Sequence, residues 1–259
     1  MVVDVGNTHT VIGLFEGRRL TRHWRLVTEP ERTADEYGML MWSLFHAAGM
    51  SVPAPDAIVV SCVVPPMIGV VEDLCRDYFH VEPLVVGPGV RTGMPILYEN
   101  PKEVGADRIV NAVAAYERTR DVTIVVDFGT ATTFDYITAR GEYVGGVIVP
   151  GIGISLDALY TRAAKLPRVE IVRPPRVVGR NTTHAIQAGI IYGYVELVDG
   201  VVRHIEREEK VRARVLATGG LAPFIATESA TIQDVDEFLT LDGLRIVYER
   251  NKDRGLAAC

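Results

Sequence analysis

Two segments of this sequence share one pattern: DVGNT at residues 4–8 and DFGT at residues 127–130. Each segment follows a short apolar run and precedes two runs of alternating apolar residues, which predicts a three-stranded antiparallel meander. The interval from the aspartate to the turn glycine is almost equal in both copies: Asp4 to Gly17, and Asp127 to Gly141. The repetition predicts an internal duplication, although chance similarity between two ordinary meanders is the alternative.

The predicted duplication divides the chain into a first domain at residues 1–118 and a related domain at residues 119–259. Helices and strands alternate after each meander, which is typical of an α/β protein. Thr33 and Glu36 have the spacing of a capping box and predict a helix start. The other predicted elements are strands at 57–63, 83–86 and 211–217, and helices opened by Pro65-Pro66, at 105–118, at 155–166, and from about 181–183 onward.

Composition excludes several classes of protein. The chain has 259 residues, 48% of them hydrophobic, and a formal net charge of -6, which argues against nucleic-acid or anionic-membrane partners. No apolar run reaches the roughly 18 residues of a membrane span, and no signal peptide is expected. Cys62, Cys75 and Cys259 are scattered and lack metal-ligand spacing. They predict reduced thiols in a cytoplasmic protein.

The two Asp-x-Gly segments have the chemistry of a phosphate site. Glycine lets the backbone approach a phosphate, threonine can donate to phosphate oxygens, and aspartate can hold a neutralising cation. One such corner alone is usually a turn. A third element, LATGGL at residues 216–221, predicts a strand feeding a glycine corner where a nucleoside could lie. No P-loop is present, and Gly151-Ile152-Gly153 lacks the third glycine of a dinucleotide fingerprint, so we expect a turn there.

The segment YENPKEVGADR at residues 98–108 carries a second chemical signal. A helix starting at Gly105-Ala106 puts Asp107 and Arg108 in its first turn. Two interpretations are open at this point. Asp107 stabilises the helix dipole, or it acts as a general base beside an anion-binding arginine.

Together these motifs resemble type III pantothenate kinases over nearly the whole chain. The resemblance rests on residues 4–8, Tyr98 with residues 105–108, and residues 127–133, 179–182 and 218–220. It implies a duplicated actin-like (ribonuclease H-like) α/β fold, with two related domains and the active site in the cleft. It also implies ATP-dependent phosphorylation of pantothenate to 4'-phosphopantothenate, the first step of coenzyme A biosynthesis.

The resemblance assigns a role to each site residue. Asp107 would be the catalytic base, and Asp127 would bind a monovalent cation, K⁺ or NH₄⁺. ATP with Mg²⁺ would contact Asp4, Val5, Gly6, Asn7, Thr8, His9, Thr10, Val11 and Thr130. Pantothenate would contact Tyr98, Gly105, Ala106, Asp107, Arg108 and Thr182. The family is dimeric, so Thr182 would serve a substrate pocket shared between the subunits of a homodimer.

Two alternatives and two departures stay open. The chain could phosphorylate another small hydroxy acid, or be an inactive regulatory homologue of the same fold. Only three residues precede Asp4, so either the given start is late or the first strand is a frayed edge strand. His9 stands where asparagine is more usual in the first hairpin of the family. It is either an ordinary polar surface residue or a hydrogen-bond donor to a phosphate.

Overall fold

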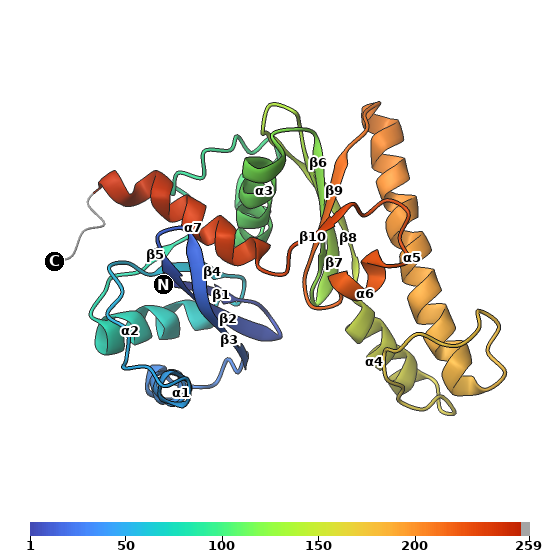
Figure 1. Cartoon of the computed structure of the whole chain (residues 1–259), viewed down its shortest axis with the longest axis horizontal. Helices are drawn as coiled ribbons and strands as arrows, with labels where there is room; N and C mark the ends of the chain where they lie inside the picture. Colours follow the sequence, from blue (N-terminus) through green and yellow to red (C-terminus); the bar gives the residue numbers. More distant parts are fainter. Residues whose placement is uncertain (255–259) are drawn as a thin grey trace. The chain divides into compact units, whose positions relative to one another are not determined.

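The computed structural model describes residues 1–254 and forms two compact units (Figure 1). The first unit comprises Met1–Met94, Glu99–Ala114 and the chain from Thr240 onward, and the second comprises Pro95–Tyr98 and Ala115–Leu239. The predicted division at residues 118 and 119 differs from this one in two ways: the second unit includes Pro95–Tyr98 and resumes at Ala115, and the last helix groups with the first unit.

The first unit holds a five-stranded sheet in the order β3-β2-β1-β4-β5. Its strands are β1 (Val2–Val5), β2 (His9–Glu16), β3 (Arg19–Val27), β4 (Val59–Cys62) and β5 (Leu84–Val85). Strand β1 pairs antiparallel with β2 and parallel with β4, so it is a central strand. Of the two alternatives for this short segment, the frayed edge strand is contradicted, because β1 is paired with a strand on each side.

The second unit repeats this topology in the order β10-β9-β6-β7-β8. Its strands are β6 (Thr123–Phe128), β7 (Ala131–Ile137), β8 (Tyr143–Pro150), β9 (Arg214–Thr218) and β10 (Asp234–Val235). Strands β6 to β10 correspond in order to β1 to β5. Gly17 and Gly141 both turn their hairpins with positive φ, 59° and 76°. The predicted duplicated actin-like α/β fold is confirmed.

Helices follow the meander in each unit (Figure 1). They are α1 (Ala34–Ala47), α2 (Met67–Phe79), η1 (Pro101–Glu103), α3 (Ala106–Thr119), α4 (Ile152–Arg162), α5 (Thr182–Glu209), α6 (Ala222–Ala226), α7 (Leu239–Asn251) and η2 (Lys252–Arg254). The predicted capping box of Thr33 and Glu36 is present at the start of α1. Helix α4 begins three residues before the predicted Ser155, because Gly151 is its N-cap.

The first sheet is covered by helices on both faces. Val3 and Val5 of β1 and Val60 of β4 pack with α1 and α2 in one buried cluster. On the other face, α7 approaches β2: a Cβ on Gly13 would lie 3.0 Å from Leu241 Cδ1. Helices α3 and α7 cross in contact, since a Cβ on Gly243 would lie 2.1 Å from the Val110 carbonyl oxygen. These contacts explain why α7 groups with the first unit.

Helix α5 is the core helix of the second unit and runs along its sheet (Figure 1). Val195, Val198 and Val202 of α5 are buried against β6 and β9. Among the described residues α5 alone is long and apolar enough to cross a membrane, with a mean hydropathy of 1.3. Half of the apolar 18-residue stretch of α5 that has this hydropathy is buried inside the protein, as expected of a core helix.

Two of the three cysteines lie within the described residues, and Cys259 lies outside them. Cys62 and Cys75 are free thiols. Burial raises the pKa of the Cys75 thiol to about 12, so this side chain stays protonated and unreactive.

Candidate active site

The first hairpin joins β1 to β2 through a short glycine loop. The Gly6 amide donates to the His9 carbonyl oxygen at 3.0 Å. A Cβ on Gly6 would lie 3.1 Å from that oxygen, so a side chain at this position would require the loop to shift. Asn7, Thr8 and His9 are exposed at its tip. This loop can present backbone amides and a hydroxyl to a phosphate.

The residues flanking that loop are not equally available to a ligand. Val5 is fully buried in the core. Thr10 is also buried, and its hydroxyl is hydrogen-bonded to that of Thr28 at 2.9 Å. Only the backbone of these two residues can meet a nucleotide. Partial burial lowers the pKa of His9, and the nearby Arg25 lowers it further, so both favour the neutral imidazole.

One face of the first sheet carries a row of four side chains in register. Asp4 of β1 is opposite Val11 of β2 and Ser61 of β4, and Val11 is opposite Arg25 of β3. Residues in register on neighbouring strands point to the same face. A carboxylate, a hydroxyl and a guanidinium therefore lie along one row next to the glycine loop.

The start of α3 holds the predicted base. Asp107 Oδ1 accepts from the Arg108 amide at 2.7 Å, so the carboxylate folds back over the helix start. A Cβ on Gly105 would lie 2.5 Å from the same oxygen, which explains why glycine precedes the helix. Burial raises the pKa of Asp107, although the Arg108 amide and guanidinium oppose that shift. A raised pKa brings a carboxylate closer to the value that suits a general base. Arg108 itself is buried.

The second hairpin, between β6 and β7, is the meeting point of three segments. Strand β9 brings Thr218 into register with Asp127. Gly219 has a φ of 91°, and a Cβ there would lie 2.7 Å from Asp127 Oδ1. Gly151 approaches from β8: its amide donates to the Thr130 carbonyl oxygen at 3.1 Å. The predicted phosphate segment and the predicted Thr-Gly-Gly corner are therefore adjacent.

Sequence reasoning missed the part that Gly151 plays here. We expected only a turn at Gly151-Ile152-Gly153. A Cβ on Gly151 would lie 2.2 Å from the Thr130 carbonyl oxygen and 2.6 Å from that of Gly129. Only glycine allows this approach. The available signal was a glycine directly after a strand of the second meander.

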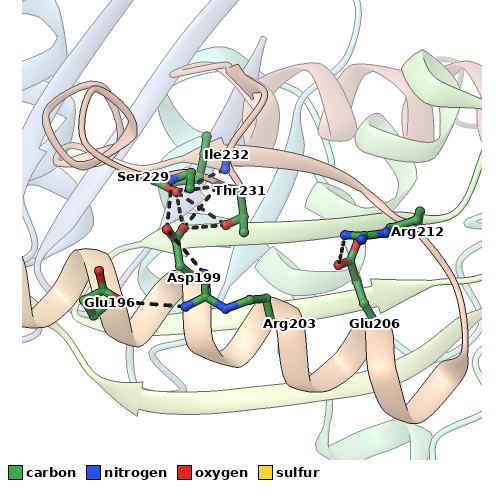
Figure 2. A network of polar contacts seen from close by, with 9 residues as sticks. Glu196, Asp199, Arg203, Glu206, Arg212, Ser229, Thr231 and Ile232 are labelled. Carbon is green, nitrogen blue, oxygen red and sulfur yellow. Dashed lines mark hydrogen bonds and ion pairs between the residues drawn. The ribbon is translucent and has the colours of Figure 1, made fainter.

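The chain after the glycine corner is held to α5 by a buried carboxylate (Figure 2). Asp199 Oδ1 accepts from Ser229 Oγ at 2.6 Å and from Thr231 Oγ1 at 2.7 Å. Its Oδ2 accepts from the Ala230 amide at 2.8 Å. Burial opposes ionisation of Asp199, but the hydroxyl and amide donors outweigh it and lower its pKa. The sequence offered no local signal for this contact.

The remaining predicted substrate residues lie in the second unit. Tyr98 packs on β8: its ring is 6.5 Å from that of Tyr143, and a Cβ on Gly145 would lie 3.4 Å from it. Thr182 is exposed in the first turn of α5, after the N-cap Asn181. A cavity of about 370 Å³ borders this helix start; it is lined by Pro175, Arg176, Val178, Gly179, Arg180, Asn181 and His184.

The predicted site residues thus fall into two sets, each within one unit. The first unit carries the residues from Asp4 to Val11 and from Gly105 to Arg108. The second unit carries Tyr98, Asp127, Thr130 and Thr182. That the sets meet across a cleft stays a prediction.

The oxygen atoms of both hairpins suit the cations that ATP chemistry uses. Mg²⁺ binds through one or two carboxylates, substrate phosphates and several waters. Asp4 supplies a half-buried carboxylate, and the described residues contain no group of three His, Cys, Asp or Glu side chains placed to hold a metal ion. At the second hairpin, Asp127 Oδ1 and the Phe128 carbonyl oxygen both approach Gly219. Carboxylate and carbonyl oxygens are ligands that K⁺ accepts.

Solved structures share the fold at low sequence identity. A Campylobacter jejuni protein assigned to the Baf family of transcriptional activators aligns with a TM-score of 0.61 and 17% identity, covering 97% of this chain and 98% of that one. A Sinorhizobium meliloti protein assigned as a 2-dehydro-3-deoxygalactonokinase aligns with a TM-score of 0.58 and 10% identity, covering 96% and 98%. These likenesses concern the fold alone.

Sequence relatives are far closer. The type III pantothenate kinase of Pelobacter propionicus is 60% identical over 252 residues, covering 97% of this chain and 99% of the relative. That of Geobacter sulfurreducens is 58% identical over 253 residues, covering 98% and 99%. A family model described as type III pantothenate kinase matches residues 1–204. The chain therefore belongs to the type III pantothenate kinase family.

Proposed function

We propose that this protein transfers the γ-phosphoryl group of ATP to the primary hydroxyl of pantothenate, with Asp107 as the base. The product is 4'-phosphopantothenate, which enters coenzyme A biosynthesis. The observation that carries the proposal is the Asp107 carboxylate, folded over the start of α3 with a raised pKa. The same unit carries the first glycine hairpin.

Asp107 accepts the hydroxyl proton and orients the oxygen for in-line attack. The transition state of phosphoryl transfer is loose, so positioning contributes more than proton removal. Gly105 matters because its missing side chain leaves room for the carboxylate. Arg108, the next residue along the helix, holds an anionic group of the substrate.

ATP lies with its phosphates against the two glycine hairpins. Amides and hydroxyls of residues 6–9 and 129–130 donate to phosphate oxygens, and Asp4 faces the accompanying cation. Bound Mg²⁺ neutralises charge on the transferred phosphoryl group. The nucleoside lies at the Thr218-Gly219 corner, whose close approach to Asp127 supports this placement.

Asp127 holds a monovalent cation, K⁺ or NH₄⁺. The approach of Asp127 Oδ1 and the Phe128 carbonyl oxygen to Gly219 supports an oxygen-lined site beside the second hairpin. A comparison of activity in K⁺, NH₄⁺ and Na⁺ buffers tests this role. This role of Asp127 would be rejected if the enzyme were fully active in a buffer with Na⁺ alone and if Asp127→Asn did not change that activity.

The protein is a homodimer, and Thr182 completes the pantothenate pocket of the partner subunit. Large apolar side chains of the second unit are exposed along β8, α4 and the loop before α5: Ile148, Ile154, Leu159, Tyr160, Val172, Val177 and Val178. Exposed apolar surface of this kind supports a protein–protein interface. Arg176 and Arg180, in the cavity next to Thr182, could join Arg108 in holding the pantothenate carboxylate.

Subunit complementation tests the shared pocket. Asp107→Asn and Thr182→Ala would each inactivate both sites of a homodimer. A mixed dimer would contain one site with both defects and one intact site. After verified random subunit exchange, activity should recover to about a quarter of the wild-type value. No recovery would place both residues in one subunit's pocket, or Thr182 outside it.

The activity itself is tested by ADP release in a coupled assay with and without pantothenate. We expect release that requires both pantothenate and Mg²⁺. Equal release without pantothenate would refute the substrate, and a panel of other small hydroxy acids would then identify the alternative acceptor. No release with any acceptor would favour the inactive homologue. The free thiols of Cys62 and Cys75 support a cytoplasmic location.

A further inference from the structure

Ser61 is a buried hydroxyl to which the site described above gives no role. It lies in β4, one residue before the strand ends at Cys62. Its exposed fraction is 0%, and its Oγ has no hydrogen-bond partner among the described residues. Burying a hydroxyl without a partner is unfavourable, so such a group in a native protein points to a water or ligand.

The position of Ser61 in the sheet brings it beside Asp4. The two residues are in register on the parallel strands β4 and β1. Neighbouring strands lie about 4.8 Å apart, and residues in register point to the same face. The Ser61 hydroxyl and the Asp4 carboxylate are therefore neighbours on that face.

The same face of β4 leads to the start of α3. Val63 follows Ser61 by two residues, and its amide donates to the Val5 carbonyl oxygen at 3.0 Å. A Cβ on Gly105 would lie 3.5 Å from Val63 Cγ1, so the segment before Asp107 packs here. Ser61 is thus close in the fold to both the Asp4 hairpin and the predicted base, all within the first unit.

The duplicated half repeats the arrangement. Thr218 of β9 is in register with Asp127 of β6, as Ser61 of β4 is with Asp4 of β1. Thr218 is also a buried hydroxyl residue, with 2% of its surface exposed. A hydroxyl therefore lies beside the hairpin aspartate in both halves, where core packing alone would accept an apolar residue.

We propose that Ser61 is a positioning residue of the Mg²⁺–ATP site, where its hydroxyl hydrogen-bonds a water that Mg²⁺ carries. This inference rests on the proposed function. Mg²⁺ keeps several of its waters in protein sites, and a buried neutral hydroxyl can hold one of them beside the Asp4 carboxylate. Ser61 then acts on the orientation of the hydrated ion and touches no reacting atom.

The test is ATP binding to Ser61→Ala by calorimetry, without pantothenate, in Mg²⁺ and in EDTA. The Kd for MgATP should rise about tenfold, the change expected when one hydrogen bond in a charged site is lost. The Kd for metal-free ATP should stay within about twofold of wild type, because Ser61 acts through the ion. The melting temperature of the ligand-free variant should not fall, since Ser61 has no hydrogen bond to lose. Ser61→Cys, whose slightly larger thiol is only a weak donor, should shift the Kd for MgATP in the same direction.

Thr132→Val is the matched control. Thr132 Oγ1 is also fully buried without a hydrogen-bond partner among the described residues. Thr132 is opposite Phe128, so it faces the core of the second unit and not the face of Asp127. This variant should leave both Kd values unchanged.

Two results overturn the inference while leaving the proposed function intact. One is an unchanged Kd for MgATP in Ser61→Ala when the wild-type chain binds MgATP. The other is an equal loss of affinity with and without Mg²⁺, which would put Ser61 on the nucleotide itself. Failure of the wild-type chain to bind MgATP would instead overturn the proposed function, and this inference with it.

Discussion

Replacing Asp199 by asparagine should loosen the segment that follows the Thr218-Gly219 corner. The wild-type Oδ1 accepts from the hydroxyls of Ser229 and Thr231 (Figure 2) and from the Thr231 amide at 3.2 Å. Its Oδ2 accepts from the Ala230 amide and lies 4.0 Å from Arg203 Nη1. Asparagine keeps only one acceptor oxygen. If that oxygen faces the two hydroxyls, the new amide group points its N–H donors at the Ala230 N–H.

The cost follows from these contacts. One charge-assisted hydrogen bond is lost and one amide is left facing another donor, so the free energy of unfolding should fall by about 2–4 kcal/mol. For a protein of this size the melting temperature should fall by about 5–15 °C. The loss concerns the second unit, which contains α5 and the segment around Ala230. Because that segment follows the proposed nucleoside corner, KM for ATP should rise more than kcat falls.

The pH dependence of the effect has a definite sign. The pKa of Asp199 is lowered in the folded state. The ionised carboxylate therefore stabilises the fold above the unfolded pKa of about 3.9, and that contribution is lost as pH falls through the lower folded pKa. The difference in the free energy of unfolding between wild type and Asp199→Asn should be largest near neutral pH and shrink below about pH 4.

Thermal unfolding at several pH values, with ATP kinetics at pH 7, measures both effects. Glu196→Gln is the control: Glu196 is 78% exposed and lies 3.6 Å from Arg203 in the same network. An exposed pair of this kind is worth about 0–1 kcal/mol. A melting temperature for Asp199→Asn that matches this control would refute the reasoning.

Four further predictions concern the site and its scaffold. Asp107→Asn should lower kcat by about 10²–10⁴-fold with little change in ATP affinity, measured by steady-state kinetics and calorimetry. In the wild type, kcat/KM should fall on the acidic side at a pH above the ordinary aspartate pKa, because the base must be ionised and burial raises the pKa of Asp107. A fall in kcat/KM only near pH 4 would contradict this. Gly105→Ala should push the Asp107 carboxylate aside and lower kcat more than stability, which kinetics with thermal unfolding would separate. Gly243→Ala should lower the free energy of unfolding by about 1–3 kcal/mol, since its Cβ would meet the Val110 carbonyl oxygen; denaturant unfolding with no loss would contradict the close crossing of α3 and α7.

Much of the fold could be predicted from local patterns. Alternating apolar residues located both meanders, and the repeated Asp-x-Gly located the ends of β1 and β6. The Thr33–Glu36 capping box marked the start of α1, because capping depends on residues three positions apart. The family resemblance supplied roles for Asp107 and Asp127 that spacing alone left open.

The sequence left undetermined the contacts between residues far apart along the chain. Ser61 is an unremarked residue of a buried strand until parallel pairing puts it beside Asp4. Gly219 reaches Asp127, and Asp199 holds Ala230, through packing that no local periodicity encodes. Helix α7 can pack against α3 of the first unit because Gly243 has no side chain at their crossing. Local composition sets which element forms, but the sheet register and the close approaches allowed by glycine decide which side chains meet.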